Sequence, residues 1–467
     1  MDTDKETSIE KKHSIKGMLS FTSIYFGLRA TVGIITTRFT FFYETEILLP
    51  ISLMTFAIIF YTVWDMFNDP LAGHLTDRNY RFTRRWGRRF PWIISSSLPV
   101  IIVFVLFFTP PDPQVSGVWA TFFWFLIMLM IFDGLTSVAG VGYNSLLVNK
   151  FRSDEERLKV SAFQQLLSTS GLVVSLVVPP FIIVYGNRAS YMIMALICGI
   201  VLLISVILSI PGLREDKELI ESYFRYEEKK VPFKESFFGM LKVSLKQKNF
   251  RSVLIITISL SVFNLIFIAS IPYYIRYVLQ AEATIELLLY LPFILAATIP
   301  IPVYFWASKK FGHLKVYVIT FFAQSVVLFV MMFVYANLII ILILVTILGI
   351  SVGLSNISGT PVVGNCYDEA AVLNKKRQEG IYLGIQTFFG RLMYIVQLFV
   401  FWIIHDLTGF APEAATQTPL AQFGIIIHMM LIPGAAMLIG ILLFMKTWDL
   451  KGDKVKNVKE KLKELQL

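Results

Sequence analysis

Long apolar stretches follow one another along almost the whole chain and constrain its fold more than any other feature. A helix needs about 20 apolar residues to cross a bilayer. Of 467 residues, 56% are hydrophobic and only 16% charged, against about 25% charged in soluble domains. The sequence therefore predicts an all-α membrane protein with twelve transmembrane helices. These helices are expected at residues 19–44, 49–75, 91–110, 117–148, 160–186, 189–210, 250–279, 283–308, 314–334, 337–363, 380–408 and 420–447.

Lysine and arginine concentrate in alternate connections between these stretches. The basic connections are residues 78–89, 150–159, 211–249, 309–315, 375–377 and the C-terminal tail. Basic loops face the cytoplasm, so both termini are predicted to be cytoplasmic in a multi-pass protein of the cell membrane. This distribution explains the net charge of +10 without nucleic-acid binding. The N-terminal segment has no cleavable signal pattern, and the first helix is expected to direct its own insertion.

The longest charged stretch divides the chain into two halves. A cytoplasmic N-terminus at 1–18 precedes a six-helix bundle at 19–210, and the central loop at 211–249 precedes a second bundle at 250–447. This layout is typical of the major facilitator superfamily, whose halves are related by a parallel repeat. In the tail at 448–467, apolar residues spaced by three and four predict a short amphipathic helix on the inner membrane surface. A frayed charged tail is the alternative.

Two carboxylates lie within the second apolar stretch. Asp65 and Asp69 are four residues apart, which puts both on one face of a helix, about 6 Å apart along its axis. A carboxylate at bilayer depth is costly and indicates a functional site. Oxygen ligands suit hard cations, and an acid in an apolar setting can carry a proton instead. We therefore predict a site for Na⁺ or H⁺. Interhelical ion pairing is the structural alternative.

The surrounding residues carry a family resemblance. Residues 64–70 read Trp-Asp-Met-Phe-Asn-Asp-Pro, an Asp-Arg pair follows at 77–78, and residues 84–92 read Arg-Arg-Trp-Gly-Arg-Arg-Phe-Pro-Trp. This pattern resembles the glycoside–pentoside–hexuronide:cation symporters, which include the melibiose permeases. Residues 367–369, 377–380 and 386–387 are also similar to that family. The resemblance covers nearly the whole chain.

The resemblance implies a cation site for Na⁺, H⁺ or Li⁺. Its implied ligands are Asp65, Asn68 and Asp69 on the second helix and Ser137 on the fourth. Asp133 precedes Ser137 by one turn and shares its face. It is a candidate further ligand, proton acceptor or partner of an arginine, and polar contact between helices is the alternative.

The implied substrate site departs from the galactoside-binding members. Positions where those members carry aspartates hold Arg29 and Gly140 here, and an aromatic and an arginine are replaced by Asn144 and Gln164. Arg391 keeps the positive charge of a lysine on the eleventh helix. The substrate-binding candidates are Arg29, Asn144, Gln164 and Arg391. Arginine binds carboxylates through two parallel hydrogen bonds, which favours an anionic solute such as a hexuronide. Charge balance with the helix-2 acids or Asp133 is the alternative for both arginines.

The arginine-rich segment at residues 84–89, called the arginine loop below, is the candidate cytoplasmic gate. We expect it to clamp against acids of the second half when the cavity opens outward. Setting the topology is the alternative role of this loop. The gate candidates are Asp77, Arg78, Arg84, Arg85, Arg88, Arg89, Asp368, Glu369, Arg377 and Glu379.

These observations predict a secondary active transporter that couples a cation gradient to the movement of a sugar, glycoside, uronate or related organic solute. A sodium-coupled lysophospholipid symporter is the nearest alternative; a channel or a membrane enzyme is less favoured. Nucleotide-binding motifs and a clustered catalytic set are missing from the sequence, so we expect no enzyme activity and no cofactor. No metal is expected beyond the coupling cation, and we expect a monomer. Arg38 is out of phase with Arg29. His428 is predicted to be a satisfied interhelical histidine, and a proton relay is the alternative.

Overall fold

The computed structural model describes residues 13–76, 78, 80–151, 153–225, 237–298, 301–376 and 378–465. Within these ranges the secondary structure is helical, and 11 helical segments are long and apolar enough to cross a membrane. The expected all-α architecture with two helical halves is confirmed. The gate candidates Asp77 and Arg377 lie outside the described residues, as do the side chains of Asp69 and Glu379.

The N-terminal half contains six membrane spans. The first comprises α1, α2 and the π-helical turn η1, and short helices follow the second and third spans. The elements are α1 (Ile15–Thr22), α2 (Ile24–Phe41), η1 (Phe42–Glu46), α3 (Ile51–Thr76), α4 (Thr83–Trp86), α5 (Phe90–Phe107), α6 (Pro113–Ser116), α7 (Val118–Lys150), α8 (Asp154–Ile182) and α9 (Arg188–Leu213).

Two short helices, α10 (Lys217–Arg225) and α11 (Phe237–Lys246), precede the C-terminal half. Its elements are α12 (Lys248–Tyr273), η2 (Tyr274–Val278), η3 (Ala283–Ile285), α13 (Glu286–Thr298), α14 (Ile301–Phe311), α15 (His313–Phe333), α16 (Leu338–Asn374), α17 (Glu379–Thr408), α18 (Pro419–Ile426), η4 (Ile427–Leu431), α19 (Ile432–Thr447) and α20 (Asp453–Glu464).

The expected span at 283–308 is described in separate parts. The structure gives η3 and α13 up to Thr298 and α14 from Ile301, and residues 299–300 between them lie outside the described residues. One helix across 283–308 therefore stays a prediction.

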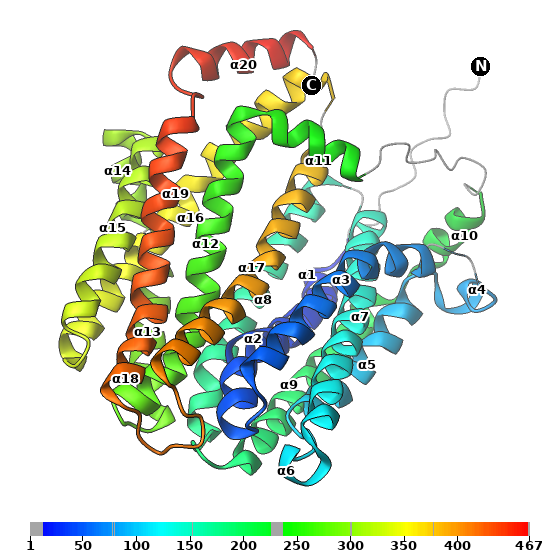
Figure 1. The fold of residues 1–467 in the computed structure, drawn as a ribbon. Helices are drawn as coiled ribbons and strands as arrows, with labels where there is room; N and C mark the ends of the chain where they lie inside the picture. Colours follow the sequence, from blue (N-terminus) through cyan, green and yellow to red (C-terminus); the bar gives the residue numbers. More distant parts are fainter. Residues whose placement is uncertain are drawn as a thin grey trace, which may run out of the picture.

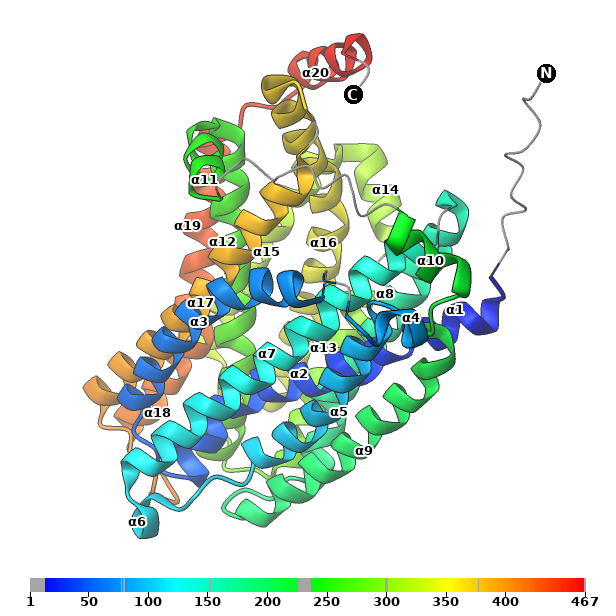
Figure 2. The same cartoon turned by 90° about the vertical axis from the view of Figure 1, so that its right-hand side faces the viewer.

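The two halves lie beside each other, with α12–α19 at the left of Figure 1 and α2–α9 at the right. We call the side with α4, α10, α11 and α20 the terminal face and the side with η1, α6 and α18 the distal face (Figures 1 and 2). The charge pattern predicts that the terminal face is cytoplasmic. Helix α17 packs along α3, and α12 packs against α2, so these helices join the two halves.

Close packing sets the position of α2 against α8. A Cβ atom on Gly171 of α8 would lie 2.3 Å from the Phe26 carbonyl oxygen and 3.2 Å from the Cβ of Arg29. Any larger residue would push the two helices apart. Glycine at this position therefore places the polar side chains of α8 within reach of Arg29.

The described residues contain three π-helical turns, in the distal parts of the spans. They are η1, η2 and η4, and each carries titratable or charged residues: Glu44 and Glu46, Arg276, and His428, respectively. A π-helical turn inserts one extra residue into a helix and is frequent at functional sites. These turns redirect charged side chains toward the junction between the halves.

Candidate functional site

An ion pair joins the two halves in the middle of the molecule. Arg391 Nη1 of α17 lies 2.6 Å from Asp65 Oδ2 of α3. The Asp65 side chain is only 3% exposed, whereas that of Arg391 is 36% exposed. The carboxylate is therefore enclosed by protein, while the guanidinium also faces open space.

A second polar contact connects α3 with α7. Asn68 Nδ2 donates a hydrogen bond to Asp133 Oδ2 at 2.7 Å, and Tyr61 OH donates to Asp133 Oδ1 at 3.3 Å. Asp65, Asn68 and Asp133 thus lie in one region of the N-terminal half. Ser137 follows on α7 and is half-buried. Asp69 continues the α3 backbone, and its side chain is not described.

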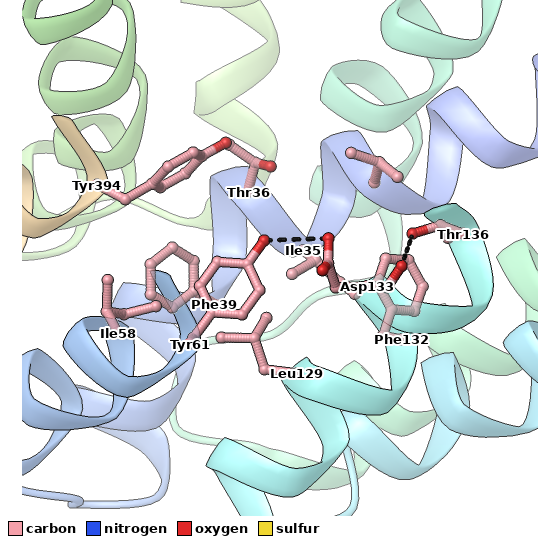
Figure 3. A pocket seen from close by; sticks show the side chains of 11 residues that line it. Ile35, Thr36, Phe39, Ile58, Tyr61, Leu129, Phe132, Asp133, Thr136 and Tyr394 are labelled. Carbon is pink, nitrogen blue, oxygen red and sulfur yellow. Dashed lines mark hydrogen bonds between the residues drawn. The ribbon is translucent and has the colours of Figure 1, made fainter. Parts of the chain in front are cut away.

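A small cavity opens beside this region. It measures about 110 Å³ and is lined by α2, α3 and α7 of one half and by Tyr394 of α17. Figure 3 shows Tyr61 pointing toward Asp133, with Tyr394 and Thr36 across the cavity. The lining is mainly apolar, with phenol, hydroxyl and carboxyl groups at separate points. Such a site can orient a small polar group while excluding bulk water.

The other substrate candidates lie within the N-terminal half. Arg29 Nε of α2 donates to Ser168 Oγ of α8 at 3.0 Å, and Tyr25 OH donates to Asn144 Oδ1 of α7 at 3.3 Å. Arg29 and Asn144 are both exposed. Gln164 lies on α8 one turn before Ser168. The alternative of charge balance applies to Arg391, which pairs with Asp65. Arg29 instead donates to the neutral hydroxyl of Ser168.

The sequence interpretation missed a buried ion pair at the distal face. Arg38 Nη1 of α2 lies 2.6 Å from Glu286 Oε2 of α13 in the other half. Their side chains are 1% and 0% exposed, and Tyr185 OH donates a hydrogen bond to Glu286 Oε1. Glu286 lies in a predicted span, so the rule that singled out Asp65 would also have indicated it.

Further charged contacts cross between the halves beside this pair. Arg276 Nη1 of η2 lies 2.6 Å from Glu46 Oε1 of η1, and Glu46 also accepts a hydrogen bond from the Gly186 backbone N–H. Glu44 of η1 is paired with His405 of α17 at 2.7 Å. The predicted spans end the first helix at Glu44 and leave Glu46 in the connection that follows. The structure instead encloses them at the junction, where they close the distal face.

The arginine loop at the terminal face makes contacts of a different kind. The guanidinium of Arg88 lies 4.1 Å from the ring centre of Tyr223, and that of Arg84 lies 5.4 Å from the ring centre of Phe224. Glu215 accepts hydrogen bonds from the backbone N–H groups of Arg89 and Phe90. The Arg89 side chain donates to Thr76. All these partners precede the second half.

Asp368 and Glu369 were expected to meet this loop, and neither pairs with it in the described part of the chain; the Glu379 side chain lies outside that part. Glu369 accepts a hydrogen bond from Asn249 at 2.7 Å and lies 3.6 Å from the Lys454 amine. Asp368 makes no ion pair among the described residues. The exposed residues Arg78 and Arg85 contact His74 and Trp86 of their own half. The predicted clamp applies to an outward-open state, and this structure is closed at the distal face instead.

Residues 20–450 match the family described as MFS/sugar transport protein. Because this match spans most of the chain, the chain belongs to that family. Its fold, its membrane spans and its family identify it as a major facilitator superfamily transporter rather than an enzyme.

Several curated proteins are similar to this chain. The sodium-dependent lysophosphatidylcholine symporter 1 of Mus musculus is 22% identical over 435 residues, covering 86% of this chain and 79% of that protein. The isoprimeverose transporter of Lactiplantibacillus pentosus is 21% identical over 225 residues, covering 46% and 44% of the two chains. An uncharacterized symporter of Synechocystis is 27% identical over 177 residues, covering 36% and 31%.

Solved structures share the fold. The nucleoside transporter NupG superimposes with a TM-score of 0.62 at 12% identity, covering 93% of this chain and 100% of that one. A bacterial homologue of the iron transporter ferroportin superimposes equally well, with a TM-score of 0.62 at 12% identity over 93% of this chain and 99% of the other.

Proposed function

We propose that this protein is a cation-coupled symporter for an organic solute that carries an anionic group. The ion pair between Asp65 and Arg391 carries this proposal. It joins an acid of the predicted cation site on α3 to a predicted substrate residue on α17, at 2.6 Å. One carboxylate thus links the cation site, the substrate site and the two halves that must move apart.

The ion pair provides a physical basis for coupling. A Na⁺ ion or a proton on Asp65 competes with Arg391 for the same carboxylate oxygens. Once Asp65 is neutralised, the guanidinium loses its partner while still facing open space. It would then bind an anionic group of the solute in a bidentate arrangement. Cation and solute would therefore each favour the binding of the other, as symport requires.

Two classes of solute are candidates. The family and the isoprimeverose transporter favour a sugar-like solute. The gained Arg29 and the retained positive charge of Arg391 favour an acidic one. A lysophospholipid is the second candidate, because the lysophosphatidylcholine symporters match most of the chain. A largely apolar cavity of about 490 Å³ in the C-terminal half also suits an acyl chain. An acidic sugar presents a carboxylate and a lysophospholipid presents a phosphate. Arg391 would bind either group.

A binding screen tests this proposal. Purified protein would be heated with sugars, uronates or lysophospholipids, with and without Na⁺ and at two pH values. A ligand at 100 times its Kd stabilises the native state by about 2.7 kcal/mol. We expect one solute class to stabilise the protein more strongly when Na⁺ is present or the pH is low.

Variants then assign the effect to the ion pair, first in binding and then in uptake by proteoliposomes. Asp65→Asn should abolish the cation dependence and gradient-driven accumulation, whereas Arg391→Gln should weaken solute binding. Asp112→Asn, which alters an exposed acid of the distal face, is the matched control and should behave as the wild type. Full concentrative uptake by Asp65→Asn would refute the assignment of the cation site.

A further inference from the structure

A buried chain of hydrogen bonds crosses between the halves at the distal face, apart from the site described above. It runs from Glu44 of η1 through His405 of α17 to His428 of η4, and ends at Ser270 of α12. The exposed fractions of Glu44, His405 and His428 are 2%, 4% and 0%. Almost no surface of these side chains is exposed, so their hydrogen-bonding groups are satisfied mainly by one another.

The distances define the connections of this chain. His405 Nδ1 lies 2.7 Å from Glu44 Oε1, and Tyr273 OH donates to Glu44 Oε2 at 2.5 Å. The two Nε2 atoms of His405 and His428 are 3.4 Å apart. His428 Nδ1 lies 2.7 Å from Ser270 Oγ.

Counting hydrogens fixes the direction of each bond. Ser270 has one hydroxyl hydrogen, and it goes to the Ile266 carbonyl, 2.6 Å away. Ser270 must therefore accept from His428, which puts a hydrogen on His428 Nδ1. When His428 is neutral, its Nε2 has no hydrogen and can only accept. The donor between the two rings is then His405 Nε2.

The remaining contact needs one more hydrogen. His405 Nδ1 and Glu44 Oε1 are 2.7 Å apart, so a hydrogen must lie between them. It belongs either to an imidazolium paired with a carboxylate or to a carboxylic acid beside a neutral ring. If His428 is the charged ring instead, it donates to His405 and the total is the same. With a hydrogen in every one of these contacts, including the one between the two rings, the chain holds one proton beyond a carboxylate and two neutral imidazoles.

The surroundings explain why that proton matters. Without it, the chain would have a net charge of −1 buried between the halves, which is costly. Tyr273 and Tyr277 are the neighbouring phenols, and Arg276 of η2 lies against Glu46. With the proton bound, the chain is neutral and each contact is satisfied.

Solvent can reach the acidic end of the chain. A pocket of about 420 Å³ is lined by Glu44 and His405, and by Asp406 and Glu413 near its mouth. Asp406 is exposed and adjacent to His405. The two further carboxylates make the pocket attractive to cations, including protons.

We propose that Glu44 and His405 form a proton-binding site whose occupation closes the distal face. Glu44 belongs to the first half, whereas His405 belongs to the second, so the site is complete only when the halves meet. Closing takes up one proton, and opening releases it. Low pH therefore favours the closed state, and high pH favours the open one.

Helix α17 gives this site a mechanical connection to the centre. His405 follows Arg391 by fourteen residues, which is about 21 Å along a helix and nearly the same face. One rigid helix thus carries two basic residues that each pair with an acid of the other half. The proposed proton site differs from the Asp65 site and does not depend on its assignment.

The test measures how often the distal face opens. Thr40 is 1% exposed and accepts a hydrogen bond from Gln397 of the other half, one turn deeper than Glu44. Thr40→Cys, with the buried Cys198 and Cys366 replaced by alanine, gives a single reporter thiol. Its labelling by a hydrophilic maleimide would be followed in purified protein between about pH 5.5 and pH 8, the range in which histidine titrates. Rates would be corrected for thiol reactivity with the same cysteine in unfolded protein.

Two variants are expected to act in opposite directions. The corrected labelling rate of the parent should rise with pH, by up to about tenfold per unit. Glu44→Gln reproduces the neutral, hydrogen-bonded form, so labelling should stay slow at every pH. His405→Ala leaves the Glu44 charge without its partner ring, so labelling should be fast throughout.

Asp406→Asn is the matched control, because it removes an exposed carboxylate of the same pocket that is outside the hydrogen-bond chain. It should keep the pH dependence of the parent. A corrected rate in the parent that does not change with pH would overturn the proposal. So would Glu44→Gln and His405→Ala changing labelling in the same direction, or a pH dependence lost in Asp406→Asn alone.

Discussion

At the distal face, Arg38 of the first half pairs with Glu286 of the second, whereas at the terminal face Arg88 lies over Tyr223 without crossing to the second half. The distal contacts are buried and join the halves. The described contacts of the terminal arginine loop stay within the chain that precedes the second half. An alternating-access transporter needs one face closed at a time. This structure is therefore closed at the distal face.

The comparison also shows what each face depends on. The distal pair is fully enclosed, so breaking it leaves a charge in a medium that cannot solvate it. In the terminal loop, Arg84 and Arg85 are exposed, so water can solvate their charges. Conformational preference should consequently respond strongly to distal variants and weakly to terminal ones.

The largest effect on opening of the distal face is expected for Glu286→Gln. It leaves the Arg38 guanidinium buried without its carboxylate, which costs about 3–5 kcal/mol. We expect the closed distal face to be lost and labelling of the Thr40→Cys reporter to rise by more than about a hundredfold. Arg38→Met combined with Glu286→Leu removes both charges and should be much milder. If the single and double variants label equally fast, the ion pair does not hold this face closed.

A smaller effect on opening of the distal face, in the opposite direction, is expected for Asp368→Asn. Asp368 makes no ion pair among the described residues of this state, so the variant costs little here. If the acid meets the arginine loop when the distal face opens, the open state loses about 0.5–1 kcal/mol. Reporter labelling should then fall by about two- to fivefold. Faster labelling would show that the terminal clamp is wrongly assigned.

The smallest effect is expected for Asp112→Asn, at the exposed rim of the distal face. The Gln114 backbone N–H, followed by Arg188, lowers the pKa of Asp112. A lowered folded-state pKa stabilises the protein above the unfolded value of about 4, and this contribution is lost as pH falls through the folded value. Thermal unfolding of wild type and variant should differ slightly at neutral pH and converge in acid. A large difference at neutral pH would mean that rim pairs also hold the face closed.

The sequence by itself determined the class of fold and the polar centre of the first half. Apolar length fixes which segments can span a bilayer, and the four-residue spacing places Asp65 and Asp69 on one helix face. The i, i+4 relation puts Asp133 on the face of Ser137, and in the structure Asp133 accepts a hydrogen bond from Asn68. The side chain of Asp69 lies outside the described residues, so its place beside Asp65 stays a prediction. Each of these inferences depends on neighbours within one helix or on hydrophobic length.

Only the tertiary structure decided which charges meet across the two halves. Glu44 and His405 are 361 residues apart in sequence, and Arg38 and Glu286 are 248 apart. No periodicity links such positions, because their contact depends on how two bundles pack and which face is closed. The π-helical turns add to this difficulty, since one inserted residue rotates Glu44 and Glu46 away from the phase of an ordinary helix. Local spacing therefore predicted the elements and the helix-2 acids, while packing between the halves determined the gate.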